Sequence, residues 1–135
     1  METLQTIAYG YVVHMPLAFS EAVARVKAAF VAEGFGVLSE IDVQAKMKEK
    51  LGKAMSEYLI LGMCHPTLAY EALQIETNIG LLLPCNVVVR TVEEGVIVAA
   101  QRPDIMLGVT GNALVTTAAQ AADEKIRRAL GQLIV

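Results

Sequence analysis

Two cysteines and a histidine are the residues of this chain best suited to chemistry. Cys64 and His65 stand directly before Pro66, where an apolar segment ends and a helix is predicted to begin. A helix N-terminus favours a thiolate, which is the nucleophilic form of cysteine. Cys64 is therefore a candidate nucleophile with His65 as its base. The simpler interpretation is that Cys64 packs as a small apolar side chain.

Pro84, Cys85 and Asn86 form a second candidate site. They lie within an apolar segment that otherwise predicts a strand, and a proline in such a segment indicates a sheet edge or a bulge. Bulges often re-aim side chains beside functional sites. Here too, a buried Cys85 that serves packing is the simpler interpretation. The sequence leaves open whether Cys64 and Cys85 lie close together.

Metal-ligand spacing is missing from the sequence. The strongest donors form no CxxC or HxxxH pair, so we predict no zinc site and no other cofactor. A two-coordinate thiolate site for Cu(I) stays open. The glycines at 34–36 and 108–111 lack the context of a dinucleotide-binding or phosphate-binding motif. The donors considered are His14, Cys64, His65 and Cys85.

Hydropathy patterns predict the elements that must position these residues. Period-two alternation and apolar runs predict strands, whereas helical spacing with capping residues predicts helices. The predicted strands cover residues 6–14, 35–41, 58–63, 81–91 and 96–102, and the predicted helices cover residues 20–33, 42–52, 66–76 and 112–130. The long hairpin around Gly95 and the few crossovers favour an antiparallel sheet, hence an α+β fold of one domain over residues 1–135. A partly parallel arrangement stays open.

Two details of these elements bear on the site. In the first predicted strand, Ala8 and Gly10 share one face, where missing side-chain volume leaves room for a ligand. In the 42–52 helix, Asp42 is the predicted cap, and Val43, Met47 and Leu51 are predicted to point inward. The sequence thus places a cavity beside the first strand.

Composition narrows the function classes. The chain is 55% hydrophobic with a net charge of −3, which excludes a disordered chain and argues against nucleic-acid binding. No unbroken apolar run reaches the roughly 20 residues of a membrane-spanning helix, and no secretory signal is visible. We therefore expect a cytoplasmic protein. The apolar excess for a chain of this size predicts a homodimer interface, a ligand cavity or both.

Three sequence blocks resemble one known family. They are residues 34–43 (GFGVLSEIDV), 61–66 (LGMCHP) and 80–87 (GLLLPCNV). Over nearly its whole length the chain resembles the bacterial and archaeal family called domain of unknown function 302. The resemblance implies a β-α-β(4)-α core similar to one repeat of the TATA-binding-protein fold, with two short helices inserted. It implies no activity, cofactor or catalytic residue, and the fold alone does not imply DNA binding.

Three functions stay open, and the sequence does not decide whether the protein is an enzyme. Our first hypothesis is a protein that binds a small, largely apolar ligand between its sheet and its helices. The second is a thiol-dependent enzyme or sulfur-relay protein that uses Cys64 or Cys85. The third is a structural or partner-binding domain. The candidate ligand-binding residues are Cys64, His65, Pro84, Cys85 and Asn86.

Overall fold

One antiparallel sheet organises the chain, and the computed structural model describes residues 4–134. The strands are β1 (Gln5–Ile7), β2 (Gly10–Met15), β3 (Gly36–Asp42), β4 (Tyr58–Cys64), β5 (Cys85–Val92) and β6 (Gly95–Gln101). The helices are α1 (Phe19–Ala32), α2 (Val43–Leu51), α3 (Pro66–Ile75), α4 (Pro103–Met106) and α5 (Ala113–Gly131), with single 3-10 segments η1 (Thr77–Leu82) and η2 (Leu107–Thr110). The strand order is β1-β2-β6-β5-β4-β3, and every neighbouring pair is antiparallel.

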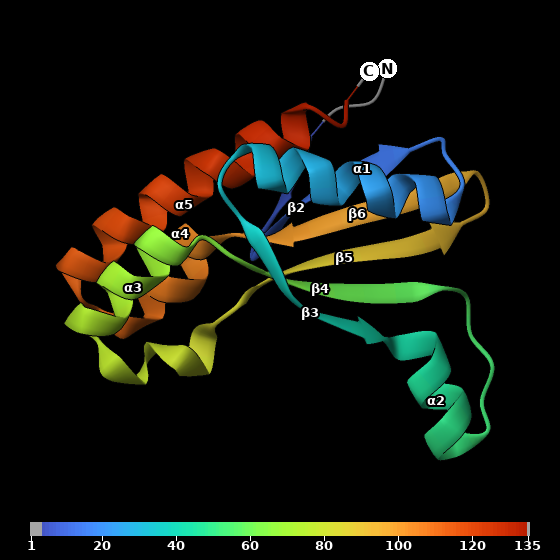
Figure 1. The fold of residues 1–135 in the computed structure, drawn as a ribbon, viewed down its shortest axis with the longest axis horizontal. Helices are drawn as coiled ribbons and strands as arrows, with labels where there is room; N and C mark the ends of the chain where they lie inside the picture. The colour runs from blue at the N-terminus through green and yellow to red at the C-terminus, as the bar shows by residue number, and fades with distance from the viewer. Residues whose placement is uncertain (1–3, 135) are drawn as a thin grey trace.

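Helices α1 and α5 pack along one face of this sheet (Figure 1). The predicted α+β class and antiparallel sheet are therefore confirmed, and β2-α1-β3-β4-β5-β6-α5 gives the expected β-α-β(4)-α order. The similarity to a TATA-binding-protein repeat stays a prediction. In the described part of the chain, the opposite face of the sheet carries no such helical layer.

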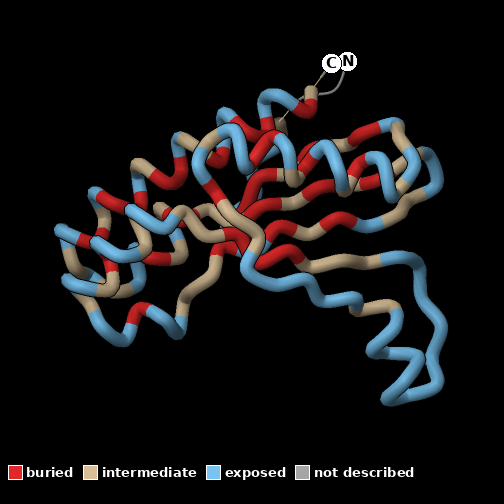
Figure 2. The backbone as a smooth tube through the Cα atoms, in the orientation of Figure 1, coloured by how far each residue is buried: buried red, intermediate tan, exposed pale blue. Residues whose placement is uncertain are grey.

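Buried apolar side chains gather in two clusters. Figure 2 marks the buried positions along the backbone. The larger cluster fills the space between the sheet and the helices α1 and α5, and Phe30, Leu61 and Ile126 are among its fully buried members. The smaller cluster joins α3, η1 and η2 to the first half of α5. Its buried members are Ala72, Ile79, Leu107, Val115 and Ala119. Helix α5 contributes to both clusters and ties them together.

One buried carboxylate joins α5 to the sheet. Asp123 is only 4% exposed, and the Tyr11 hydroxyl donates to it at 2.7 Å. Arg127, one helical turn further on, lies 3.2 Å from the same carboxylate. Burial is the largest cause raising the pKa of Asp123, and it also raises the pKa of Tyr11 to about 12. These partners satisfy a polar group that would otherwise be costly to bury.

The first predicted strand is wrong in one respect. Residues 6–14 do not form one strand, because β1 ends at Ile7 and β2 begins at Gly10. Ala8 and Tyr9 form the tight turn of a hairpin, in which Ile7 pairs with Gly10. Period-two alternation of side chains continues across a two-residue turn, so the hydropathy pattern alone did not reveal the turn.

The predicted strand at 81–91 also begins later than expected. Residues 77–82 form η1, and β5 starts only at Cys85. Leu81 is 88% exposed, so its hydrophobicity does not mark a buried strand position. The Leu83–Pro84 peptide bond is cis and lies between η1 and β5.

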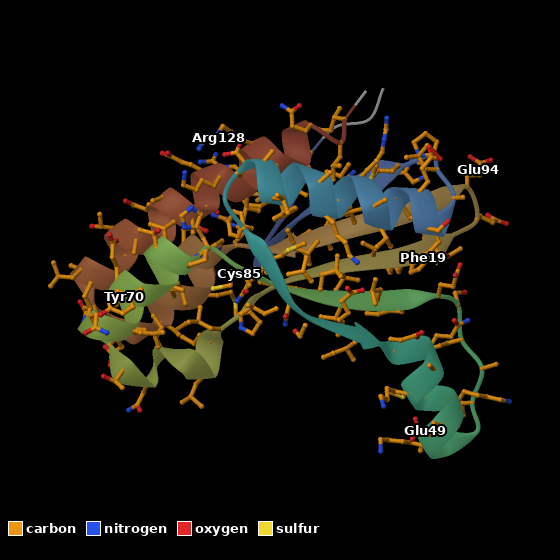
Figure 3. The ribbon with its side chains drawn as sticks, in the orientation of Figure 1. Phe19, Glu49, Tyr70, Cys85, Glu94 and Arg128 are labelled. Atoms are coloured by element: carbon orange, nitrogen blue, oxygen red, sulfur yellow. The ribbon has the colours of Figure 1, made fainter. Side chains whose placement is uncertain are left out.

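Helix α2 and the loop after it form an arm, defined here as residues 43–57, that extends beyond the edge strand β3 (Figures 1 and 2). Asp42 caps this helix as predicted, because its carboxylate accepts from the Ala45 N–H at 2.9 Å. The inward orientation predicted for Met47 and Leu51 is wrong, since Leu51 is 63% exposed and α2 has no buried residue. Glu49 on this helix lies well away from the sheet (Figure 3). Within residues 4–134, no element forms a second layer over α2 beyond the sheet edge, and no α2 residue is buried.

Candidate functional site

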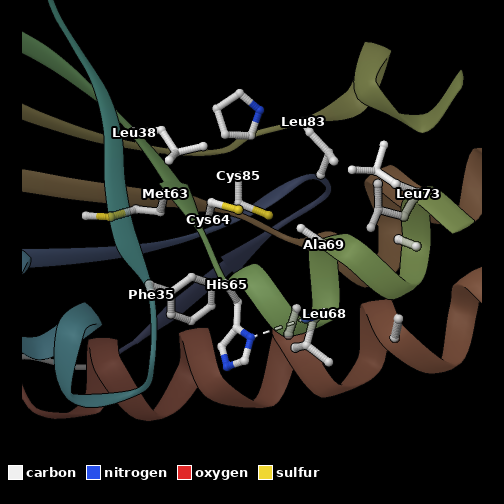
Figure 4. Close-up of a pocket in the computed structure, with 15 residues that line it drawn as sticks. Phe35, Leu38, Met63, Cys64, His65, Leu68, Ala69, Leu73, Leu83 and Cys85 are labelled. Atoms are coloured by element: carbon white, nitrogen blue, oxygen red, sulfur yellow. Dashed lines mark hydrogen bonds between the residues drawn. The ribbon is translucent and has the colours of Figure 1, made fainter. Parts of the chain in front are cut away.

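A pocket of about 250 Å³ lies where the sheet ends and α3 begins (Figure 4). We call it the β4–α3 pocket. It occupies the seam between the two hydrophobic clusters, because residues of both contribute to its wall. Its lining residues are Phe35, Leu38, Met63, Cys64, His65, Leu68, Ala69, Ala72, Leu73, Leu83, Pro84, Cys85, Leu107, Ala118 and Ala122.

Cys64 and His65 line this pocket from the junction of β4 and α3. Cys64 is the last residue of β4, and His65 is the N-cap of α3. The His65 Nδ1 accepts from the Leu68 N–H at 3.4 Å (Figure 4), and Pro66 occupies the first helical position, which needs no donor. The His65 ring also packs edge-to-face on Phe35, with 5.5 Å between ring centroids. Both neighbours orient the imidazole.

The two thiols approach the same pocket from neighbouring strands. Met63, which precedes Cys64, pairs directly with Cys85 across β4 and β5. Both cysteines are free, Cys64 half-buried and Cys85 buried, and their side chains lie at the pocket in Figure 4. The question that the sequence left open is answered, since Cys64 and Cys85 share one cavity.

Burial controls the titration of these groups. It raises the pKa of Cys64, and it raises the pKa of Cys85 to about 11 with a smaller contribution from the nearby Cys64. Burial and then the positive charge of Lys125 lower the pKa of His65. At neutral pH the pocket therefore presents two thiols and a neutral imidazole.

Pro84 reaches the pocket because Gly62 has no side chain. A Cβ at Gly62 would lie 2.8 Å from Pro84 Cγ and would also collide with Ser39 Oγ. Gly62 pairs with Ser39 on one side and with Asn86 on the other. Near the pocket, Ser39 and Pro84 therefore approach β4 more closely than they could if residue 62 had a side chain.

Asn86 does not join the other candidates. It is exposed on β5, its strand position faces opposite to Cys85, and its backbone N–H donates to Gln101 Oε1 at 3.3 Å. The β4–α3 pocket does not lie beside Ala8 and Gly10, but a separate groove of about 250 Å³ is lined in part by Gly10 and its neighbour Tyr9. Because β1 and β2 form a hairpin, Ala8 is a turn residue, and the pocket forms at the other edge of the sheet.

Sequence reasoning missed two features of the lining. Leu38 is the extra residue of a bulge, since Val37 and Ser39 pair with the consecutive residues Met63 and Gly62. The bulge brings Leu38 to the rim of the pocket although its side chain is 67% exposed. The other feature is a set of small residues on facing helices that leaves the volume open. They are Ala69 and Ala72 on α3, and Ala118 and Ala122 on α5.

The helical spacing of these alanines was visible in the sequence. The spacing alone did not show that α3 and α5 face each other across a gap. Only their packing in the fold reveals it.

Metal-binding groups do not gather anywhere in residues 4–134. No three His, Cys, Asp or Glu side chains there are placed to hold an ion. His14 lies outside the pocket, on β2, where its Nε2 donates to the Glu94 carbonyl oxygen. Over the same described residues, none of the helices combines the length and the apolar character that crossing a membrane requires.

Comparison with known proteins identifies relatives of this chain. The family model described as domain of unknown function DUF302 matches residues 11–133. The crystal structure of an uncharacterized conserved DUF302 protein from Bacillus stearothermophilus is similar, with a TM-score of 0.84 and 24% sequence identity. The similarity covers 91% of this chain and 96% of that one, so the two share a fold. No curated protein matches the chain.

Proposed function

Because the chain belongs to the DUF302 family, whose description assigns no activity, we propose from the site alone that it binds a small, largely apolar molecule in the β4–α3 pocket. The observation that carries this proposal is the wall of the pocket. Nearly every lining side chain is aliphatic, aromatic or a neutral thiol, and none is an acid, a lysine or an arginine. Such a cavity favours ligands whose buried part is uncharged.

The size of the pocket limits the ligand. A dry apolar cavity of roughly 150 Å³ in another protein holds one benzene ring. The β4–α3 pocket, at about 250 Å³, has room for a two-ring aromatic or a short branched chain. A longer molecule would extend past Leu38 into the solvent, because that rim residue is largely exposed.

The polar groups of the pocket would select among such ligands. The Cys64 and Cys85 thiols are weak donors, and the His65 Nδ1 already accepts from α3. These three groups could accommodate one hydrogen-bonding atom on the ligand. They would not offset the free-energy cost of burying a fully charged group. Pro84 supplies a rigid apolar edge.

A thiol-dependent enzyme or sulfur-relay protein is the less favoured alternative. Such a function needs a thiolate near neutral pH. Burial raises the pKa of both Cys64 and Cys85, so both are protonated in the pocket as it stands.

The test measures the binding of indole to the parent protein and to a variant whose pocket is filled by a larger side chain. In Ala69→Leu the added carbons enter the pocket, whereas in Ala28→Leu they enter solvent from the exposed side of α1. Binding is followed by the ¹³C methyl signal of Met63, which lines the pocket, with the exposed Met47 methyl as internal reference. Native mass spectrometry of untagged protein, before and after denaturation, reports any ligand that copurifies.

We expect indole to shift the Met63 signal and leave that of Met47 unchanged. Ala69→Leu should weaken binding by about tenfold or more, which corresponds to roughly 1.4 kcal/mol, and Ala28→Leu should bind like the parent. Equal binding by Ala69→Leu and the parent, or no Met63 shift together with no copurified mass, would refute the proposal.

The expected homodimer and cytoplasmic location also stay proposals. The apolar fraction of 55% supports self-association. Light scattering over a concentration series tests the homodimer. Fractionation of the source cells tests the cytoplasmic location.

A further inference from the structure

The face of the sheet opposite α1 and α5 carries an apolar row across five strands. Register places one residue of each strand in line, from β3 at the edge to β2. The row consists of Ile41, Ile60, Val88, Ala99 and Val12. These five members are apolar although they face away from the helices, and the row ends at the polar Gln5 of the edge strand β1. We call this surface the open face.

The open face is also hollowed beside the row. A groove of about 250 Å³ lies there, and its apolar wall includes Ile7, Val88, Ala99 and Met106. Neighbouring rows are more polar, with Arg90 near one end of the strands and Asn86 near the other. An apolar stripe with a polar rim is the arrangement found at protein interfaces.

The arm presents a second uncovered apolar surface. Met47, Leu51 and Met55 are between 37% and 63% exposed, and α2 buries no residue. The arm keeps a defined shape nonetheless, because Gln44 Nε2 donates to the Met55 carbonyl oxygen at 2.9 Å. A formed helix with no buried side receives little stabilisation from its own chain, since packing normally supplies most of it.

The charges of the arm and of the remaining chain are complementary. The arm holds four of the 11 basic residues and two of the 14 acidic ones, a net charge of +2. Because the whole chain has a net charge of −3, the residues outside the arm together have a net charge of −5. Two copies with this division attract each other where the arm of one meets the body of the other.

The areas agree with the needs of a dimer. Six strands at about 4.8 Å spacing and about 20 Å length give the open face roughly 600 Å². A nine-residue helix adds roughly 130 Å², from about 13 Å of length and 10 Å of width. A standard interface buries about 800 Å² per partner, so the sheet alone falls short and the sheet with the arm nearly reaches it.

We propose that a second copy of this chain covers the open face, with the apolar side of each arm closing on the body of the other copy. This inference rests on the proposed homodimer and assigns its surface. A twofold arrangement suits it, because each copy offers the same stripe and the same arm.

The experiment compares three lysine substitutions by sedimentation velocity at several micromolar concentrations. Val88→Lys places a charge at the middle of the row, and Ile41→Lys places one at the edge strand, where Ile41 is already 46% exposed. Ala28→Lys places the same charge on α1, on the other side of the molecule. Circular dichroism checks that each variant folds. If Val88→Lys does not fold, Ile41→Lys is the variant that tests the open face.

We expect the parent and Ala28→Lys to sediment as dimers, and the folded open-face variants to dissociate at concentrations at least tenfold higher than the parent. A folded Ile41→Lys or Val88→Lys variant that dimerises like the parent would overturn the assigned surface while the homodimer stands. A monomeric parent at 100 µM, roughly the concentration at which weak specific pairs are occupied, would overturn both.

Discussion

At the scale of single residues, the thiols show how two opposing effects are resolved. The start of α3 should lower the pKa of Cys64, because helix N-termini stabilise negative charge. The His65 imidazole, however, accepts one N–H of the first turn, and the pocket removes water from the sulfur. Desolvation is the larger effect, and the pKa of Cys64 is raised.

The buried thiol of Cys85 predicts a pH dependence of stability. Its pKa rises from 9.0 to about 11 on folding, so the folded chain holds this proton more tightly than the unfolded chain. The stabilisation is therefore complete below pH 9 and is lost as the pH rises towards 11, by up to about 2–3 kcal/mol. Urea unfolding at a series of pH values should show the loss.

Cys85→Ala is the control for this prediction, because it removes the titrating group and leaves Tyr11, whose pKa is also raised. The free energy of unfolding of Cys85→Ala should fall less steeply between pH 9 and 11 than that of the parent. Parallel slopes for the two proteins would contradict the assignment. Alkylation of the native parent at pH 7.5 should modify the half-buried Cys64 before Cys85.

At the scale of elements, one wall of the pocket forms where β3 and the segment that leads into β5 both lie close to β4. Gly62 permits it, since Ser39 and Pro84 both occupy the space of its absent side chain. The bulge at Leu38 lies one step further along β3. The three strands meet the pocket through residues that are unremarkable when they are taken one at a time.

We predict that Gly62→Ala destabilises the protein by about 1–3 kcal/mol, because Ser39 or Pro84 must move to admit a methyl group. Gly36→Ala is a matched control on the neighbouring strand, where a Cβ would meet nothing within 4 Å. It should change the free energy of unfolding by less than about 0.5 kcal/mol. Thermal and urea unfolding measure both, and equal effects of the two substitutions would contradict the packing argument.

At the scale of the whole molecule, the pocket lies between two cores of unequal size. Among residues 4–134, twenty buried residues form the larger cluster and five form the smaller, and α5 is the element that contributes buried residues to both. A cluster with few buried contacts opens at lower free energy than a large one. We therefore expect the α3 side of the pocket to be its more adaptable wall and the sheet to be its more rigid wall. That residues 1–135 form one domain stays a prediction.

Native-state hydrogen exchange should reveal this difference. We expect amides of α3 to exchange at lower opening free energy than amides of β5 and β6. Saturating indole should slow exchange in α3 and leave β2, which is remote from the pocket, unchanged. Uniform protection across α3 and β5 would show that the two clusters open as one unit.

Local signals in the sequence determined most of the elements. Asp42 caps the helix that it was predicted to cap, Pro66 opens α3, and the predicted start of the last helix at residue 112 agrees with the start of α5 at Ala113. The turn signal around Gly95 predicted the hairpin in which β5 and β6 pair antiparallel. The three blocks quoted above also led to the correct family, and the sequence nominated four of the lining residues, Cys64, His65, Pro84 and Cys85. Each of these signals depends on neighbours within one turn or one hairpin.

Only the tertiary structure decided which of these residues meet. Apolar spacing along one segment does not show what lies across a gap, so the pattern of the 42–52 helix predicts an inward Met47 and Leu51 although the helix buries no residue. Asn86 is one of the candidate residues, but it lies on the face of β5 opposite Cys85 and outside the pocket. The pocket itself arises from small residues of α3 and α5 that are about 50 positions apart in the sequence. A cavity is a property of surfaces brought together by the fold, and no single segment contains it.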